Sequence, residues 1–490
     1  MKILFVSAEV FPFSKVGGLG DVCGALPPAM ASVEHSVTVV TPAYATLDRT
    51  HIGIEQLPLQ LTIKLGAETI TLSVSRYQNP ANARHVVYFI EHPALFGTRN
   101  VYTDASGQPY ADNPRRFLAF QKAVLELIIQ QGWAPDVIHC HDNHTALLPV
   151  YLKTTFARLP RLARTPSVLT LHNIAYQGLT DMSERPLFDL PEELFTPLQP
   201  LEWYGKINPL KAGIIYADVV TTVSPTHARE IRESDQLSGG LRGVLNSRSR
   251  PVVGILNGVD YHLWHPARDP FIRQKYDRST LEQKIINKRH LLEKMHLPES
   301  LERNLVIGMV TRLVEQKGLE LLTVCLPELL KEELGLVVLG SGEARYQQLL
   351  QTNAENYPHK IAVSFGYDDP LAHQIIAGCD LFLMPSRFEP CGMTQMYALR
   401  YGTPPLAHRT GGLADSVRNW DGVNGNGFLF DQFTPAALIN NVRYARACYD
   451  QPEIWRKIQG NGMEQNFSWP KAADEYLRLY QSLVAGKSAF

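Results

Sequence analysis

Short, nearly continuous runs of apolar residues recur along the 490-residue chain, and segments of helical length separate them. In the first half of the chain the runs lie at residues 3–6, 37–40, 86–90, 137–139, 168–171 and 219–223. A second series lies at residues 252–256, 305–310, 336–339, 361–365, 381–384 and 428–430. Runs this short and this rich in Val and Ile are typical of parallel strands that helices cover on both faces. Two consecutive series predict an α/β protein with two doubly wound, Rossmann-like domains in tandem.

A turn-rich stretch at residues 256–270 marks the boundary between the predicted domains. We therefore expect an N-terminal domain at 1–257 and a C-terminal domain at 258–466. Apolar residues recur at helical spacing near the end of the chain, so residues 467–490 are predicted to form a helix that crosses back to the first domain. Open α/β sheets bind ligands at the carboxyl ends of their strands, so two such sheets would face a deep cleft between the domains.

Composition and charge exclude several classes of protein. The formal net charge is −1, so we expect neither nucleic acid nor a membrane surface as a partner. The six cysteines include no Cys-x-x-Cys pair, which indicates reduced thiols and not disulfides or a zinc site. No apolar stretch reaches the roughly 18 residues that a membrane span needs, and the first apolar run is too short for a signal peptide. We expect a cytoplasmic protein, whose oligomeric state the sequence does not define.

A glycine-rich loop follows the first predicted strand, with the sequence KVGGLGD at residues 15–21. Glycines at a strand-to-helix turn let the backbone approach a ligand, and the free N–H groups of a helix start favour an anion. The spacing is not G-x-G-x-x-G, so a dinucleotide fold is not indicated. On the glycines alone, a plain turn is an equally good interpretation; the neighbouring Lys15 favours a phosphate or sugar ligand.

Three further strand ends in the second domain carry candidate chemistry. Arg312 and Lys317 follow the run at 305–310, where they form a plausible diphosphate clamp, although two such cations alone are more often a solvated pair. The glycine-containing segment 339–343 follows the next run. After the run at 381–384 comes PSRFEPCGMT, in which Glu389 could accept hydrogen bonds from sugar hydroxyls and the amides of 392–394 could face a phosphate. The alternative for this segment is a proline-bounded loop with an ordinary ion pair.

Histidines gather at two strand ends of the first domain. His139 and His141 would share one face of a strand, as in a metal site, but no further ligand set stands out and we predict no metal. His172 begins the segment HNIAYQG after the run at 168–171. It could be structural, but in this context we expect it to line the cleft.

Taken together, these motifs resemble those of bacterial glycogen synthases, a family shared with plant starch synthases. The resemblance rests on segments that follow one another in the expected order between about residues 1 and 430, at 7–10, 15–22, 141–142, 172–178, 256–260, 311–318, 386–394 and 410–413. It implies a GT-B fold, ADP-glucose as the donor, and extension of an α-1,4-glucan such as glycogen with retention at the anomeric carbon.

The resemblance also implies roles for individual residues. The predicted catalytic residues are His172, Arg312, Lys317 and Glu389, of which Arg312 and Lys317 would offset the diphosphate charge and Glu389 would bind the transferred glucose. Lys15 and the backbone of Gly17 and Gly18 would meet the donor phosphates, and Tyr367 would stack on the base. Asp142, Asn173 and Asn257 would line the glucose and acceptor side. The other predicted substrate-binding residues are Asp21, Gly340, Ser341, Gly342, Cys391, Gly392, Met393 and Thr394.

One difference in sequence from related retaining transferases favours the glycogen and starch synthases among them. Many of them carry a second glutamate eight residues after the first, whereas that position here is Tyr397, and glycogen and starch synthases also lack the second carboxylate. We find no Asp-x-Asp element, so we predict metal-independent transfer without a cofactor, in which cationic side chains stabilise the leaving group. No carboxylate is clearly placed as a nucleophile, which favours attack from the same face over a covalent intermediate.

Three other functions remain open at this point. The first is a related transferase that uses UDP-glucose or a small acceptor such as a sucrose or trehalose precursor. The second is a phosphorylase with pyridoxal phosphate, which shares the broad architecture. The third is a non-catalytic protein that binds a sugar nucleotide or a glucan; the combination of Lys15, His172, Arg312, Lys317 and Glu389 argues against it.

Overall fold

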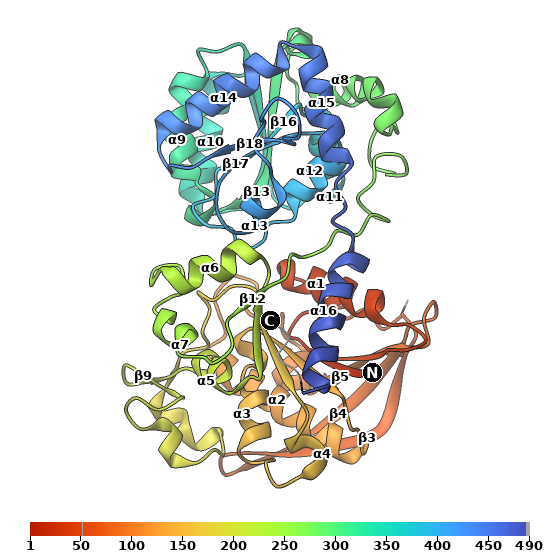
Figure 1. The fold of residues 1–490 in the computed structure, drawn as a ribbon, viewed down its shortest axis with the longest axis vertical. Coiled ribbons are helices and arrows are strands. Elements are labelled where there is room, and N and C mark those ends of the chain that lie inside the picture. The colour runs from red at the N-terminus through yellow and green to blue at the C-terminus, as the bar shows by residue number, and fades with distance from the viewer. Residues whose placement is uncertain (51, 487–490) are drawn as a thin grey trace. The chain divides into compact units, whose positions relative to one another are not determined.

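A computed structural model describes residues 1–50 and 52–486. The chain divides into two compact units, which are described separately. Unit 1 contains Met1–Val223, Ala228–Gly258 and the segment that begins at Trp469; unit 2 contains Ser224–His227 and Val259–Ser468. Figure 1 shows that each unit is built on a sheet with helices packed against it.

The sheet of unit 1 has nine strands in the order β12-β11-β7-β6-β1-β2-β5-β4-β3. Seven strands pair in parallel, and β3 and β4 form an antiparallel hairpin at one edge. The strands are β1 (Lys2–Val6), β2 (Ser36–Pro42), β3 (Ile54–Leu65), β4 (Glu68–Gln78), β5 (His85–Glu91), β6 (Val137–His141), β7 (Ser167–Leu171), β11 (Val219–Thr222) and β12 (Val253–Gly254). A separate small sheet contains β8 (Thr180–Asp181), β9 (Glu202–Trp203) and β10 (Lys206–Ile207).

Both faces of the parallel part of this sheet are buried, which explains why its strands read as continuous apolar runs. Within β1, Leu4 and Val6 enter one hydrophobic cluster, whereas Ile3 and Phe5 enter a second cluster. Successive side chains of a strand point to opposite faces, so each face of the sheet has its own core. The helices of unit 1 are α1 (Gly18–Met30), α2 (Asn113–Gln130), α3 (Leu147–Lys153), α4 (Pro160–Ala163), α5 (Pro209–Tyr216), α7 (Arg242–Asn246) and α16 (Trp469–Val484). Helix α6 (Pro225–Glu233) belongs to unit 1 from Ala228 onward, and its first three residues belong to unit 2.

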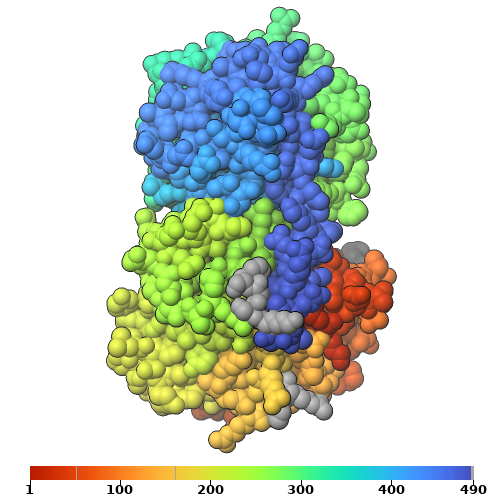
Figure 2. Space-filling model, viewed as in Figure 1, coloured from red at the N-terminus to blue at the C-terminus, as the bar shows by residue number. Residues whose placement is uncertain are grey.

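The last helix, α16, packs beside α1 although the two lie at opposite ends of the chain (Figure 1). The surface view shows the same neighbourhood, with α16 against the amino-terminal segment (Figure 2). The apolar residues predicted to line one helix face, including Tyr476 and Leu479, are buried in the cluster that also holds α1. Residues 487–490 of the predicted terminal segment lie outside the described residues.

The sheet of unit 2 has six strands, all parallel, in the order β15-β14-β13-β16-β17-β18. They are β13 (Leu305–Leu313), β14 (Leu334–Gly342), β15 (Ile361–Phe365), β16 (Leu381–Met384), β17 (Pro405–His408) and β18 (Phe428–Phe430). The helices are α8 (Lys284–Lys294), α9 (Leu319–Leu329), α10 (Ala344–Asn356), α11 (Asp369–Gly378), α12 (Thr394–Arg400), α13 (Gly411–Ser416), α14 (Pro435–Tyr449) and α15 (Pro452–Met463).

Two Rossmann-like α/β units were predicted, and the prediction is confirmed, with one strand assigned to the wrong sheet. The run at 252–256 was expected to open the second series, but β12 pairs in parallel with β11 in the sheet of unit 1. The hairpin of β3 and β4 and strand β17 were not predicted. In β3, Leu61, Ile63 and Leu65 are buried while the residues between them are exposed, an alternation that a search for continuous runs misses.

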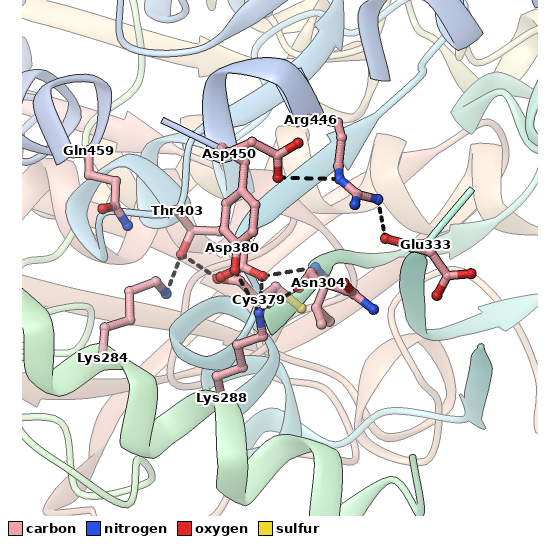
Figure 3. Close-up of polar contacts among 12 residues, drawn as sticks. Lys284, Lys288, Asn304, Glu333, Cys379, Asp380, Thr403, Arg446, Asp450 and Gln459 are labelled. Atoms are coloured by element: carbon pink, nitrogen blue, oxygen red, sulfur yellow. Dashed lines mark hydrogen bonds and ion pairs between the residues drawn. The ribbon is translucent and has the colours of Figure 1, made fainter. Parts of the chain in front are cut away.

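Unit 2 also contains a buried polar network near the amino ends of β13 and β16 (Figure 3). Nζ of Lys288, on α8, lies 2.6 Å from Oδ2 of Asp380, 2.7 Å from the carbonyl oxygen of Asn304 and 3.0 Å from the hydroxyl of Tyr449. The same carboxyl oxygen accepts a hydrogen bond from the N–H of Val306, 2.8 Å away. One ion pair therefore joins α8 to the starts of two central strands, at the opposite end of the sheet from the strand ends that carry the candidate site.

We expect removal of one partner of this pair to destabilise unit 2 strongly. Asp380→Ala would leave the Lys288 ammonium buried without its anion, at a cost of about 3–5 kcal/mol of unfolding free energy. Urea unfolding monitored by circular dichroism measures the change. Arg289→Ala is the control. Arg289 lies on the exposed side of the same helix, and its ion pair with Glu302 contributes little because it is near the surface. Equal effects of the two substitutions would contradict this account of the network.

Candidate active site

The predicted site residues of unit 1 lie where the strand order of its sheet reverses. Strand β1 lies between β2 and β6, so the chain leaves β1 toward one edge and later continues from β6 toward the other. Doubly wound sheets bind ligands beside such a switch point, at the carboxyl ends of the strands. The segment after β1 holds the glycine-rich loop, and the segment after β6 begins with Asp142.

Glu9 holds the glycine-rich loop in place. Its Oε2 accepts hydrogen bonds from the N–H groups of Val16, at 2.5 Å, and Gly17, at 3.0 Å, while Oε1 accepts from the hydroxyl of Tyr102 at 2.6 Å. The carboxyl group is buried, which raises its pKa. The N–H of Gly17, predicted to face a donor phosphate, thus points at an internal carboxylate. The N–H of Gly18 forms no hydrogen bond with any residue in the described part of the chain.

Sequence reasoning did not assign a function to Glu9. It follows a strand in which every residue after Lys2 is buried, and it is itself 3% exposed. An acid at such a place is unusual unless it has partners, and this was the available signal.

The two charged side chains of the loop pair with each other. Nζ of Lys15 lies 2.7 Å from Oδ1 of Asp21, and it also lies 5.5 Å from the ring centroid of Phe11. Both charged groups are partly exposed. The loop therefore presents the ammonium group of Lys15, and a stronger anion can replace Asp21 as its partner.

The structure brings Asp142, His172 and Asn173 together, across the ends of β6 and β7. Oδ1 of Asp142 accepts hydrogen bonds from the backbone N–H groups of His172, at 2.7 Å, and Asn173, at 3.4 Å. Asp142 has a φ of 55°, which is a strained conformation for a residue with a side chain. Burial raises the pKa of Asp142 to about 7, against the effect of the two amides.

A chain of histidines connects this corner to the core. Nε2 of His172 lies 3.0 Å from Nδ1 of His141, and burial lowers the pKa of His172 to about 3, so the ring is neutral near pH 7. His139 has a structural role, because its two ring nitrogens contact the hydroxyls of Tyr480 and Thr170, each at 2.6 Å. Within residues 1–50 and 52–486, no three His, Cys, Asp or Glu side chains are grouped as a metal site.

The candidate site of unit 2 lies at the switch point of the second sheet. Strand β13 lies between β14 and β16, and the segments after β13 and β16 carry the predicted residues. Nζ of Lys317 lies 2.5 Å from Oε2 of Glu389, which also accepts a hydrogen bond from the hydroxyl of Ser386 at 3.0 Å. Glu389 is buried and Lys317 is largely buried. The structure thus joins two residues predicted separately, 72 positions apart.

Close backbone contacts bring these two segments together. Gly318 has a φ of +75°, and a Cβ atom there would lie 1.9 Å from the carbonyl oxygen of Pro385. The N–H of Arg387 donates to the carbonyl of Gln316 at 2.9 Å. Only a residue without a side chain allows the segment after Lys317 to approach the segment before Glu389 so closely.

Other predicted residues of unit 2 lie at the carboxyl ends of β13, β15 and β16 or in the segments that follow them. Arg312 is exposed near the end of β13, and its side chain has no ion pair or hydrogen bond with the residues that the structure describes. Tyr367 is 84% exposed after β15. Cys391 is buried, and Gly392 and Met393 precede Thr394, where α12 begins. The amide of Gln395 donates to the carbonyls of Cys391 and Gly392, at 3.2 and 2.9 Å, which shapes this turn.

The segment of Gly340, Ser341 and Gly342 differs from the prediction. These residues do not follow a strand but form the last part of β14, in parallel register with β13. A Cβ atom at Gly340 would lie 2.0 Å from the carbonyl oxygen of Thr311. Contact between two strands is therefore a sufficient physical reason for that glycine, and close approach of a ligand is not required to explain it.

Asn257 lies at the end of unit 1, where its Oδ1 is buried and has no hydrogen-bond partner within the described chain. A hollow of about 500 Å³ lies elsewhere in unit 1, lined by Ile215, Ala217, Asp218, Ser247, Arg248, Ser249 and Arg250. Asp218 directly precedes β11, so this hollow is at the amino end of a strand and does not coincide with the switch point. In the described part of the chain, no helix is long and apolar enough to cross a membrane.

Two family models match the chain, one in each half. The model "Starch synthase catalytic domain" matches residues 2–247, and "Glycosyl transferases group 1" matches residues 294–459. A glycogen synthase of Anaeromyxobacter dehalogenans is 42% identical over 488 residues, which cover 99% of this chain and 100% of that protein. Glycogen synthase 2 of Nitrosococcus oceani is 42% identical over 492 residues, covering 99% and 98% of the two chains.

Solved structures show the same relationship. The catalytic domain of starch synthase IV from Arabidopsis thaliana, bound to ADP and acarbose, superposes with a TM-score of 0.89 at 33% identity, covering 99% of both chains. A sucrose-phosphate synthase from Thermosynechococcus elongatus superposes with a TM-score of 0.60 at 15% identity, covering 99% of this chain and 100% of the other. The second likeness concerns the fold alone.

The contact at Gly318 leads to a stability prediction. Gly318→Ala would force apart the segments that carry Lys317 and Glu389, so we expect a loss of about 3 kcal/mol or more in unfolding free energy. Gly422→Ala is the matched control in the same unit, because Gly422 has a φ of +87° and a Cβ atom there would have no neighbouring atom within 4 Å. Backbone strain alone predicts about 1–2 kcal/mol there. Equal losses in urea unfolding would show that the contact with Pro385 is unimportant.

The environment of Asp142 leads to a prediction about pH. Its pKa is about 7 in the folded protein and 3.8 without the fold, so its contribution to stability is complete below about pH 4 and is lost as pH rises through 7. We expect the melting temperature of the wild type to fall across this window relative to that of Asp142→Asn, which cannot ionise. Asp181→Asn, at an exposed position, is the control. If the melting temperatures of wild type and Asp142→Asn changed with pH in the same way, the raised pKa of the buried Asp142 carboxyl would be contradicted.

Proposed function

The chain is a glycosyltransferase of the glycogen and starch synthase family, which transfers glucose to an α-1,4-glucan, and we propose that its donor is ADP-glucose. Transfer takes place to the non-reducing end of the glucan with retention at the anomeric carbon, and ADP is released. Glycogen is the acceptor that we propose, and the reaction takes place in the cytoplasm. The structure of the plant relative bound to ADP and acarbose supports ADP as the leaving nucleotide.

The observation that carries this proposal is the contact between Lys317 and Glu389 at the switch point of unit 2. A carboxylate there accepts hydrogen bonds from the hydroxyls of the transferred glucose, and a cation beside it neutralises the diphosphate. The two groups pair with each other at 2.5 Å, so neither charge is left unpaired in a largely buried place. In the complex the diphosphate pairs with the ammonium of Lys317, and the sugar hydroxyls donate hydrogen bonds to the carboxylate of Glu389.

Departure of ADP requires stabilisation of negative charge on the diphosphate. Lys317 supplies one cation, and Arg312, with its exposed guanidinium, supplies a planar donor that can bind a phosphate through two hydrogen bonds. Two fixed cations stabilise the leaving group without a divalent metal. Tyr367, with most of its ring exposed, stacks on the base of the nucleotide.

Unit 1 carries the residues that we propose for the acceptor and for a phosphate contact. Lys15 exchanges Asp21 for a donor phosphate, and the free N–H of Gly18 at the start of α1 adds a hydrogen bond. Asp142, His172 and Asn173 line the glucose. Because His172 is neutral, it acts as a hydrogen-bonding group for a hydroxyl and not as a cation. Asn257, with its unpartnered Oδ1, accepts a further hydroxyl hydrogen.

Retention is explained by attack on the same face from which ADP leaves. A covalent intermediate needs a carboxylate that is free to attack the anomeric carbon, but Glu389 accepts hydrogen bonds from Ser386 and from the sugar hydroxyls in the proposed complex, and Asp142 accepts two backbone N–H groups. The acceptor hydroxyl therefore attacks as the bond to the diphosphate breaks, and its proton passes to a phosphate oxygen of the leaving ADP. A trapped glucosyl-enzyme on either carboxylate would contradict this mechanism.

The decisive test is incorporation of glucose into glycogen from ADP-glucose and from UDP-glucose, each with and without EDTA. We expect higher kcat/KM with ADP-glucose and no effect of EDTA. Lys317→Ala and Glu389→Ala should lower kcat by about a hundredfold or more, because each removes a group that interacts with the transition state. Lys331→Ala, which breaks an exposed ion pair with Glu328, is the control.

Preference for UDP-glucose would contradict the donor assignment, and unchanged transfer by Lys317→Ala and Glu389→Ala would contradict the site. Loss of activity with EDTA that Mg²⁺ restores would contradict metal-independent transfer.

A further inference from the structure

The turn that is proposed to bind the donor, residues 389–394, leads directly into α12. This helix has only seven residues, Thr394–Arg400. A helix this short is not stable in water by itself, so packing against its neighbours has to determine where it lies. The orientation of the turn therefore depends on what supports α12.

Three nearly parallel rings form a column against α12. Tyr397, from α12, stacks on Trp264 with ring centroids 4.1 Å apart and planes 5° apart. Trp264 also stacks on His373, from α11, with centroids 3.6 Å apart and planes 8° apart. Two flat rings cannot share one face of an indole at these distances, so Trp264 lies between the other two. The column links α12 to α11 through a residue that belongs to neither helix.

A buried carboxylate fixes the base of the column. Oδ2 of Asp269 lies 2.7 Å from Nδ1 of His373 and accepts a hydrogen bond from the hydroxyl of Tyr401 at 2.5 Å. Its Oδ1 accepts from the N–H of Phe271 at 2.8 Å, and the side chain is fully buried. Tyr401 directly follows α12. Asp269 thus binds both His373, the ring at one end of the column, and Tyr401, the residue that follows α12.

The other end of the column reaches the donor turn. The hydroxyl of Tyr397 contacts Sδ of Met393 at 3.9 Å, and Met393 is the last residue of the turn before α12. The backbone N–H of Tyr397 donates to the carbonyl of Met393 at 3.0 Å. A displacement of the Tyr397 ring would therefore move the turn that carries the proposed sugar and phosphate contacts.

We propose that Tyr397 and Trp264 are positioning residues for the donor: the column of Tyr397, Trp264 and His373, held by Asp269, fixes α12 and thereby the donor turn. The inference rests on the proposed function, because it assigns a support to the same site. Position 397, where many related transferases have a second glutamate, is here the residue that joins the turn to the column. Neither residue is among those proposed to contact the donor or the acceptor.

The test separates donor binding from acceptor binding. Tyr397→Leu removes one ring from the stack. Trp264→Leu breaks the column without changing any residue of α12 itself. For both variants we expect the KM for ADP-glucose and the Kd for ADP, measured by calorimetry, to rise about tenfold or more, because small displacements of binding groups weaken a positioned site. The KM for glycogen should stay unchanged. Tyr397→Phe keeps the stacked ring and should keep near-normal values for the donor.

Tyr444→Leu is the matched control for lost packing. Tyr444 lies on α14 of the same unit and contacts Phe428 edge to face, with centroids 5.6 Å apart, away from α12. It should lower the melting temperature without changing either KM. In a double-mutant cycle, Tyr397→Leu should have little further effect on ADP affinity once Trp264 is Leu, since the two residues act through one column.

The outcomes distinguish this inference from the function on which it rests. If wild-type protein binds ADP, and Tyr397→Leu and Trp264→Leu bind it equally well at temperatures where they are folded, the column is packing alone and the inference is wrong. Additive effects in the cycle would also contradict it. If wild-type protein neither binds ADP nor uses ADP-glucose, the proposed donor is wrong, and the inference fails with it.

Discussion

Parallel strand pairing is the constraint on which the rest of this structure depends. It directs the six strands of unit 2 and seven strands of unit 1 the same way, so the loops that follow these strands emerge at one end of each sheet. At the reversal of strand order, neighbouring loops diverge and leave room for a ligand. Lys317 and Glu389 are 72 residues apart in the chain and meet because β13 and β16 are neighbours. Glu9 and Asp142 likewise lie at the same end of the sheet of unit 1, because they follow the neighbouring parallel strands β1 and β6.

Buried carboxylates then give these loops their shape. Glu9 accepts two backbone N–H groups of the glycine-rich loop, Asp142 accepts two at the end of β7, and Asp269 connects α11 with the residue after α12. A carboxylate can accept several hydrogen bonds at once, and burying it without them is costly. Each carboxylate therefore selects one loop conformation out of many. Asp380 does the same at the other end of the sheet of unit 2, where it binds Lys288.

The sequence allowed prediction of what repeats locally and missed what depends on distant partners. Continuous apolar runs identified most parallel strands, because both faces of each sheet are covered. The hairpin of β3 and β4 escaped because its buried residues alternate, and β17 begins at a proline, which a search for strands penalises. Lys317 and Glu389 were found from their place after strands. The support by Trp264 could not be predicted, because it acts through contacts that only the folded chain creates. An acid after an apolar strand was a signal for Glu9, but the sequence did not identify the N–H groups that it holds.

Two of the proposed donor cations are paired with carboxylates, Lys15 with Asp21 and Lys317 with Glu389. An unpaired ammonium in a largely buried place, such as that of Lys317, would be unfavourable, so the neighbouring carboxylate stabilises it. A ligand has to replace that anion. A neutral sugar cannot do so, whereas a diphosphate brings enough charge to compete and a sugar attached to it can occupy the released carboxylate. Internal ion pairs thereby favour a sugar nucleotide over a free sugar, because only the former satisfies both partners of the broken pair at once.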